Sequence, residues 1–126
     1  MSNTERALKF IDHWNNRDIE GVMGSMTKDC FYHNIPMDPQ KGYDEIRSSL
    51  EPFIQMASNI EWIVHSIAED SNGTVLTERT DRFEINGQWM DILVMGVMEF
   101  EDGLISNWRD YFDMKAYETE TARVLG

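Results

Sequence analysis

Two oppositely charged residues share the apolar face of one predicted strand. Residues 74–85 alternate in polarity, and Arg79 and Asp81 fall on the same parity as Val75 and Phe83. Because strand side chains point to opposite faces with a period of two, both charges are expected to face the core. A desolvated charge is costly unless it is paired, so the two side chains should form an ion pair. Such a pair can lack any catalytic role, and a bulge in the strand could also expose both side chains.

A second carboxylate lies on the last predicted strand, residues 104–112. The parity of that strand that is expected to face inward comprises Leu104, Ser106, Trp108, Asp110 and Phe112. If one strand separates the two carboxylates, Asp81 and Asp110 face a common cavity with their backbones roughly 10 Å apart. Arg79 stands beside Asp81 and could bridge the pair.

A short extended segment, residues 30–35, carries two further polar groups. Tyr32 and Asn34 share one of its faces, and Pro36 ends the segment. If this segment lines the same cavity, the phenol and the amide would offer hydrogen bonds beside the carboxylates. The spacing of the residues does not place the segment there.

A pair of carboxylates joined by one cation suits general acid–base chemistry. One group must give a proton while the other takes one, and their environments can impose these different protonation states. A pocket that serves them should be mostly apolar, with a few convergent polar groups. From their parities beside the two carboxylates, the predicted pocket residues are Phe83, Ile92, Val94, Trp108 and Phe112.

Helices precede strands along the chain. Apolar residues at helical spacing predict two N-terminal helices, with Ala7, Phe10, Ile11 and Trp14 in the first and Ile19, Val22, Met23 and Met26 in the second. We expect Asn3 or Thr4 to cap the first helix and Asp18 to cap the second. A third helix, residues 43–57, contains Pro52 and is expected to kink or break there.

Four strands and a short terminal helix follow. The strands are predicted at residues 59–68, 74–85, 88–100 and 104–112, and the helix at residues 114–122. Asn86-Gly87 and Asp102-Gly103 are hairpin turn signals, so the last three strands should form a meander. Helices first and a meander afterwards predict an α+β fold, with helices packed on one face of a curved, mostly antiparallel sheet.

The strand at residues 88–100 is apolar on both parities. One parity holds Met90, Ile92, Val94 and Met98, and the other holds Leu93, Met95 and Val97. Both faces should therefore be covered, but a single layer of helices covers only one of them. The sequence predicts a homodimer that buries the other face, because monomers seldom expose a large apolar patch.

Composition limits the classes of function. A chain of 126 residues is expected to form one domain, residues 1–126. The formal net charge of −12 argues against nucleic acid or an anionic membrane as a partner. No apolar run is long enough to cross a bilayer, and no signal peptide is recognised. Cys30 is the one cysteine, which allows no intrachain disulfide and fits a reducing cytoplasm.

No metal or cofactor motif accompanies the charged residues. His13, His33 and His65 have no metal-ligand spacing with one another. A glycine-rich loop of the kind that binds phosphates is also lacking. We therefore expect an activity that uses neither a metal nor a cofactor.

Three motifs together resemble one enzyme family. They are Tyr32-His33-Asn34-Ile35-Pro36, Glu78-Arg79-Thr80-Asp81 and Trp108-Arg109-Asp110-Tyr111-Phe112-Asp113. In this order, and over most of the chain, the sequence resembles the limonene epoxide hydrolase family, within the nuclear transport factor 2-like, or SnoaL-like, superfamily. The resemblance implies a cone-shaped fold, in which N-terminal helices pack on a strongly curved, mixed, mostly antiparallel sheet that encloses a deep apolar pocket.

The resemblance also implies a role for each polar residue. Asp110 would be the base, Asp81 the acid and Arg79 the link between them. Tyr32 and Asn34 would hold the attacking water. The implied reaction opens a small, largely apolar epoxide, such as limonene epoxide or a cycloalkene oxide, to a vicinal diol by one-step attack of water.

Two other functions stay open. An isomerase or cyclase of the ketosteroid isomerase or polyketide cyclase type would use one carboxylate as a base on the same fold. A non-catalytic dimeric module that binds a small ligand would not need five polar groups directed into an apolar cavity. The second carboxylate and the bridging arginine favour the hydrolase.

Overall fold

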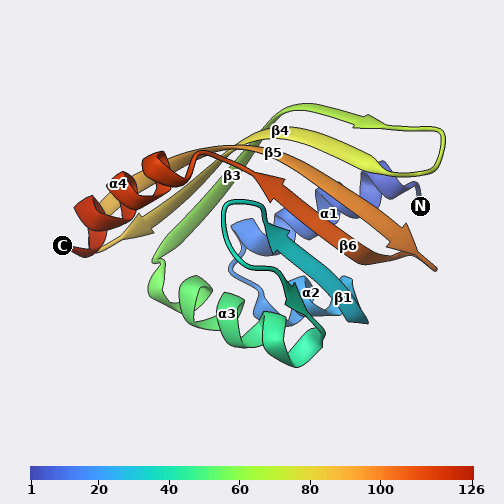
Figure 1. Cartoon of the computed structure of the whole chain (residues 1–126), viewed down its shortest axis with the longest axis horizontal. Coiled ribbons are helices and arrows are strands. Elements are labelled where there is room, and N and C mark those ends of the chain that lie inside the picture. The colour runs from blue at the N-terminus through green and yellow to red at the C-terminus, as the bar shows by residue number, and fades with distance from the viewer.

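The computed structural model describes all 126 residues, which fold into helices on a single sheet. The helices are α1 (Asn3–Asn15), α2 (Ile19–Gly24), α3 (Tyr43–Met56) and α4 (Met114–Leu125). The strands are β1 (Met26–Asn34), β2 (Gln40–Lys41), β3 (Asn59–Glu69), β4 (Val75–Ile85), β5 (Gln88–Glu101) and β6 (Leu104–Tyr111). This arrangement confirms the predicted α+β class (Figure 1).

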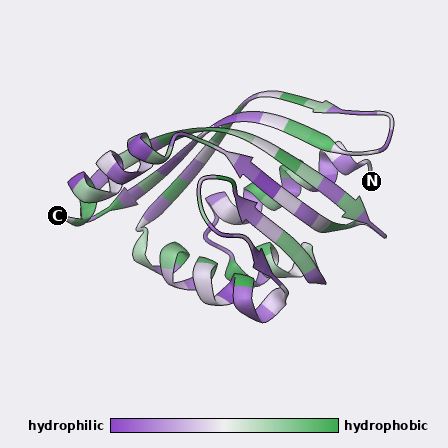
Figure 2. Cartoon of the chain, viewed as in Figure 1, coloured by the Kyte–Doolittle hydropathy of each residue, from purple (hydrophilic) through white to green (hydrophobic).

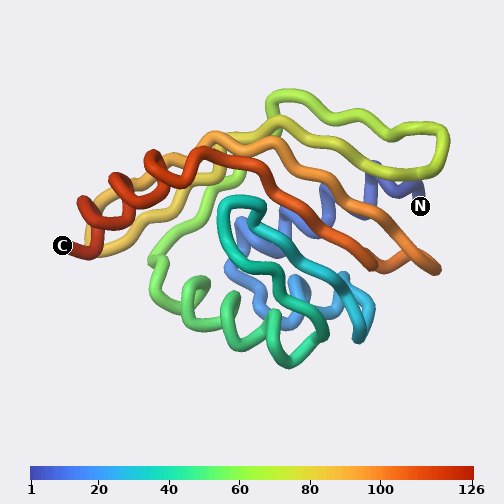
Figure 3. The backbone as a smooth tube through the Cα atoms, viewed as in Figure 1, coloured from blue at the N-terminus to red at the C-terminus, as the bar shows by residue number.

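The sheet is mixed and strongly curved. Its strand order is β2-β1-β6-β5-β4-β3, and every neighbouring pair is antiparallel except β1 and β6, which are parallel. The sheet arches over α1, α2 and α3, as the backbone trace in Figure 3 shows. The predicted meander is confirmed, so β4 and β6 lie on either side of β5.

Local signals explain where the first helices begin. Ser2 caps α1 in a capping box with Glu5, so the predicted caps at Asn3 or Thr4 are wrong by one or two residues. Asp18 caps α2 as predicted, because its side chain accepts a hydrogen bond from the backbone N–H of Gly21. Met26, which was expected in this helix, opens β1 instead.

The third helix runs through its proline. α3 is continuous from Tyr43 to Met56, so of the kink or break expected at Pro52 the break is wrong. Apolar residues on both sides of the proline, among them Leu50 and Ile54, are buried in the core. Their packing holds the two halves together despite the backbone hydrogen bond that the proline cannot make.

Tight turns set the register of the meander. Asn86 and Gly87 both have positive φ angles, 54° and 75°, between β4 and β5. Asp102 and Gly103 repeat this pattern, with φ angles of 51° and 81°, between β5 and β6. Two successive positive φ angles belong to a type I′ turn, which confirms the predicted hairpins.

The two faces of the central strands differ sharply. On β4, each residue of the predicted inward parity, Arg79 and Asp81 included, is buried. β5 is rich in hydrophobic residues (Figure 2), which occupy both parities, but only one parity is covered within the chain. Leu93 and Met95 on the outer face are 74% and 51% exposed. The chain alone therefore leaves an apolar outer sheet face.

The alternation of β6 is interrupted near its start. Ile105 is buried while Leu104 is 39% exposed, so the predicted inward position of Leu104 is wrong. The register between β5 and β6 shifts at Glu99 and Phe100, where one extra residue is accommodated. After this bulge the inward parity resumes at Trp108, as the site requires.

None of the helices is long and apolar enough to cross a membrane.

Candidate active site

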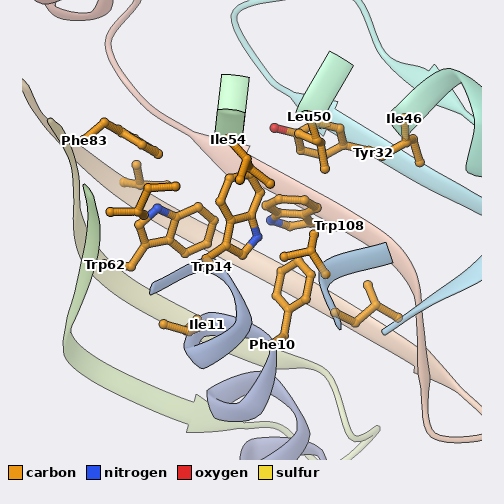
Figure 4. Close-up of a cluster of buried hydrophobic side chains, with 14 of the residues drawn as sticks. Phe10, Ile11, Trp14, Tyr32, Ile46, Leu50, Ile54, Trp62, Phe83 and Trp108 are labelled. Atoms are coloured by element: carbon orange, nitrogen blue, oxygen red, sulfur yellow. The ribbon is translucent and has the colours of Figure 1, made fainter. Parts of the chain in front are cut away.

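An aromatic cluster forms the base of the site. Trp14 of α1 stacks on Trp62 of β3 with ring centroids 4.5 Å apart. Tyr32 of β1 stacks on Trp108 of β6 at 4.2 Å, and Phe10 meets the same tryptophan edge-on at 5.0 Å. Figure 4 shows these rings with α1 on one side and Leu50 and Ile54 of α3 on the other. Their packing fixes the backbone positions from which the polar residues project.

A cavity of about 260 Å³ opens beside this cluster. Twelve of its 17 lining residues are hydrophobic, which makes it a small apolar pocket. The lining residues are Trp14, Tyr32, Asn34, Met37, Gln40, Ser49, Leu50, Phe53, Trp62, Asp81, Phe83, Ile92, Val94, Trp108, Asp110, Phe112 and Tyr117. The five nominated pocket residues, Phe83, Ile92, Val94, Trp108 and Phe112, are all in this set.

Arg79 joins the two carboxylates beneath the cavity. Its Nε and Nη2 donate to the two carboxylate oxygens of Asp81, both at 2.9 Å. The same Nη2 donates to Oδ2 of Asp110 at 3.0 Å. The guanidinium also lies over the ring of Trp62, 4.5 Å from its centroid, and the arginine side chain is fully buried. The side chains thus close the gap of two strand spacings that separates the carboxylate-bearing strands.

Burial governs the charges in this cluster. It raises the pKa of Asp81 to about 6, although the Arg79 guanidinium opposes the shift. Burial also works against the charge of Arg79, but the Asp110 and Asp81 carboxylates outweigh it and hold its pKa above the ordinary value. Asp81 therefore keeps its proton to a higher pH than an ordinary aspartate does.

Two side chains hold the Asp110 carboxylate at the wall of the cavity. Its Oδ1 accepts a hydrogen bond from Trp108 Nε1 at 3.0 Å, and its Oδ2 accepts from Arg79. The carboxylate still borders the cavity, so a water molecule there could reach it. Hydrogen bonds from these two donors fix the orientation of the carboxylate.

Parallel pairing of β1 with β6 brings the remaining polar residues to the cavity. Asn34 lies directly opposite Asp110 in this pairing, and Tyr32 lies opposite Trp108. Both Tyr32 and Asn34 line the cavity. Burial raises the pKa of the Tyr32 phenol, with a contribution from the Asp110 charge, so the phenol keeps its proton and can donate a hydrogen bond.

All five polar residues nominated from the sequence therefore meet at one place. Arg79 is the one that does not border the cavity, since it lies behind the two carboxylates. The structure adds Trp14 and Trp62 to the wall, and the sequence showed these only as apolar positions. Thr77 was also missed, although its inward parity on the same strand as Arg79 was a signal. Its hydroxyl accepts from Arg79 Nη1 at 3.0 Å.

No group of three or more His, Cys, Asp or Glu side chains is arranged to hold a metal ion. The one cysteine, Cys30, is a buried free thiol. Burial raises its pKa to about 12, so it is protonated at neutral pH and is a poor nucleophile.

Both the sequence and the fold are similar to those of known epoxide hydrolases. The epoxide hydrolase EphG of Mycobacterium tuberculosis (strain ATCC 25618 / H37Rv) is 33% identical over 105 residues, which cover 83% of this chain and 69% of that protein. The solved structure of an LEH-like epoxide hydrolase of M. tuberculosis has a TM-score of 0.83 and 30% identity, covering 98% of this chain and 91% of that one.

A more distant structure confirms the fold. An NTF2-like protein from Cytophaga hutchinsonii ATCC 33406 has a TM-score of 0.76 at 19% identity, and the match covers 94% of this chain and 96% of that one.

The model of the family described as "Limonene-1,2-epoxide hydrolase catalytic domain" matches residues 1–123. The chain therefore has the nuclear transport factor 2-like fold and belongs to the limonene-1,2-epoxide hydrolase family of epoxide hydrolases.

Proposed function

We propose that this protein opens a small, largely apolar epoxide to a vicinal diol in one step, without a metal or a cofactor. The observation that carries the proposal is the buried arginine shared by two carboxylates at the wall of an apolar cavity. Limonene epoxide and cycloalkene oxides are the proposed kind of substrate, because the cavity offers few polar groups beyond this cluster.

In the proposed reaction the two carboxylates act on opposite sides of the substrate. Asp110 takes a proton from a water molecule held by Tyr32 and Asn34, and the water oxygen forms a bond to one epoxide carbon. The bond from that carbon to the epoxide oxygen breaks, and Asp81 gives its proton to this oxygen. The site is restored when Asp110 releases its proton and Asp81 takes one up. Each turnover adds one water to one epoxide.

This arrangement supports the hydrolase over an isomerase or cyclase on the same fold. Those reactions need one carboxylate as a base, whereas here a second carboxylate with a raised pKa shares the same arginine. A binding module would have no use for this costly buried cluster. The two-carboxylate cluster thus supports acid and base acting together.

The test is a panel of epoxides incubated with the purified protein and analysed for diol by chiral gas chromatography. The panel should include limonene-1,2-epoxide, cyclohexene oxide and a bulkier polar epoxide. We expect diol from the small apolar members and little from the polar one. Absence of enzymatic diol from every member of the panel would refute the proposed function.

The pKa of Asp81 predicts the pH dependence. Only the protonated form of Asp81 can donate a proton to the epoxide oxygen. The pKa of Asp81 is raised to about 6 in the free protein. Since kcat/KM reports the free enzyme, it should fall roughly tenfold per pH unit once the pH rises above this value. Initial rates at low substrate concentration between pH 5 and 9 measure this decline, which is the alkaline limb of the pH profile. A kcat/KM that stays constant or rises across pH 6 to 9 contradicts the role of Asp81.

We also propose that the protein is a homodimer that works in the cytoplasm. The exposed Leu93 and Met95 on the outer face of β5 support the dimer, since an apolar sheet face favours a covering partner. Light scattering should give twice the monomer mass of 14.7 kDa at micromolar concentration. Leu93→Lys should shift this mass toward the monomer, and a wild-type protein that is monomeric at this concentration contradicts the proposal.

The buried thiol of Cys30, without a disulfide partner, supports a reducing compartment.

A further inference from the structure

Gly96 of β5 lies where the strands that carry the charged cluster meet. It pairs with Thr77 on β4 and with Asp110 on β6. A Cβ atom at Gly96 would overlap Nη1 of Arg79 and lie 2.6 Å from Oδ1 of Asp110 and 3.1 Å from Oγ1 of Thr77. The space that a side chain would fill is therefore occupied by the ends of the cluster.

The lack of room for a side chain, and not the backbone conformation, explains why residue 96 is a glycine. Gly96 is not among the glycines with a positive φ angle, so another residue could adopt its backbone. Arg79, however, must cross over β5 to reach Asp110 from its own strand. Only a residue without a side chain leaves that crossing open.

Thr77 fixes the end of the arginine that the carboxylates leave free. Arg79 uses Nε and Nη2 for the carboxylates, and Thr77 Oγ1 accepts from Nη1 at 3.0 Å. Thr77 is 1% exposed, and no other group accepts a hydrogen bond from Nη1. Its hydroxyl and the open space at Gly96 together determine how the guanidinium lies between the strands.

We propose that Thr77 and Gly96 are positioning residues for the epoxide opening, because they hold the Arg79 guanidinium where both carboxylates share it. This inference rests on the proposed function. Neither residue lines the cavity, so both act through the arginine and not on the substrate. Their loss should lower kcat and leave KM nearly unchanged.

Removal of the Thr77 hydroxyl tests the first half of the proposal. Thr77→Val keeps a similar shape but leaves Nη1 without its acceptor, so kcat should fall about tenfold, as expected for one lost hydrogen bond to a charged group. Thr77→Ser keeps the hydroxyl and should retain most of the activity. Thr80→Val is the matched control, because Thr80 lies on the outer face of the same strand, where its hydroxyl meets His65.

Addition of a methyl group at Gly96 tests the second half. In Gly96→Ala the methyl displaces the flexible ends of Arg79 and Asp110 and not the backbone, so the protein should fold. A displacement of the guanidinium by about 1 Å should lower kcat on the order of 100-fold. Gly24→Ala is the control, since a Cβ at Gly24 meets no atom within 4 Å.

The pH profile separates positioning from a structural role. We expect the added methyl to push the guanidinium and the Asp110 carboxylate apart while the two bonds to Asp81 stay, and this cation disfavours the proton that Asp81 must keep. The alkaline limb of kcat/KM should therefore move to lower pH in Gly96→Ala. A purely structural effect lowers the folded fraction and the melting temperature without moving this limb. Wild-type kcat and an unmoved limb in both Thr77→Val and Gly96→Ala would overturn the inference, as would a Thr77→Ser variant as impaired as Thr77→Val.

A substrate-free measurement keeps this inference distinct from the proposed function. Carbon-13 NMR titration of the Asp81 carboxyl should give a lower midpoint in Gly96→Ala than in the wild type and the Gly24→Ala control. If the wild type opens no epoxide, the proposed function fails, and this titration still decides the inference. Equal midpoints in the three proteins overturn it.

Discussion

Asp110→Asn and Asp81→Asn are each expected to lower kcat by about 100- to 10,000-fold, the range typical of general acid–base residues. An amide at position 110 cannot take the proton of the attacking water. An amide at position 81 can hold the epoxide oxygen but cannot protonate it. The two effects are also linked, because the Asp110 charge helps to raise the pKa of Asp81. Asp110→Asn should therefore lower the protonated fraction of Asp81 as well as remove the base.

The control for these variants is Asp91→Asn on β5. The Asp91 carboxylate lies on the outer face of the sheet, where it accepts from Arg82. This variant undergoes the same chemical change but should keep kcat within about twofold, since exposed ion pairs contribute little. Circular dichroism and melting curves for all three variants check that each is folded. A folded Asp81→Asn or Asp110→Asn protein with near wild-type kcat would remove that residue from the mechanism.

Arg79→Lys is expected to lose most activity and also stability. A lysine carries the same charge, but its compact ammonium cannot replace the planar fork that makes two bonds to Asp81 and reaches Asp110. At least one buried hydrogen bond to a charged group is lost, which should lower the free energy of unfolding by roughly 1.5–3 kcal/mol. We expect kcat to fall on the order of 100-fold, because the acid and the base are no longer held in one geometry.

A second arginine on the same strand provides the control. Arg82 lies on the outer face of β4 and bonds to Glu61 and Asp91. Arg82→Lys should leave kcat unchanged and alter stability by less than about 1 kcal/mol. Urea denaturation and steady-state kinetics on the two variants make the comparison. Equal behaviour of Arg79→Lys and Arg82→Lys would show that the fork geometry of the buried arginine is unimportant.

The features that could be predicted from the sequence are those that depend on local residue patterns, namely strand parity and tight turns. The parity of β4 placed Arg79 and Asp81 inward, and the two-residue turns at 86–87 and 102–103 placed β6 two strands away from β4. These predictions hold because strand alternation and type I′ turns are set by nearest neighbours. Together with the inward parity of Asp110 on β6, they bring Asp81 and Asp110 to one cavity.

Other features needed information that spacing does not contain. Tyr32 and Asn34 reach the site through parallel pairing between β1 and β6, which joins segments far apart in the chain. Only the family resemblance placed them there in advance. The bulge near Ile105 was missed, although Leu104 and Ile105 are two successive apolar residues that interrupt the alternation of the strand. Ser2 was missed as a cap although Ser2 and Glu5 have capping-box spacing.

The central claim is that water, activated by Asp110, attacks the epoxide directly. A nucleophilic carboxylate would instead form an ester, and its hydrolysis would need a separate base. No histidine lines the cavity to supply one.

The most direct test is a single turnover in heavy-oxygen water with the enzyme in excess over the epoxide. The proposed mechanism predicts labelled diol in that first turnover and no label in Asp110 or Asp81 by mass spectrometry of the digested protein. Unlabelled diol, with the heavy oxygen in either carboxylate, would contradict it.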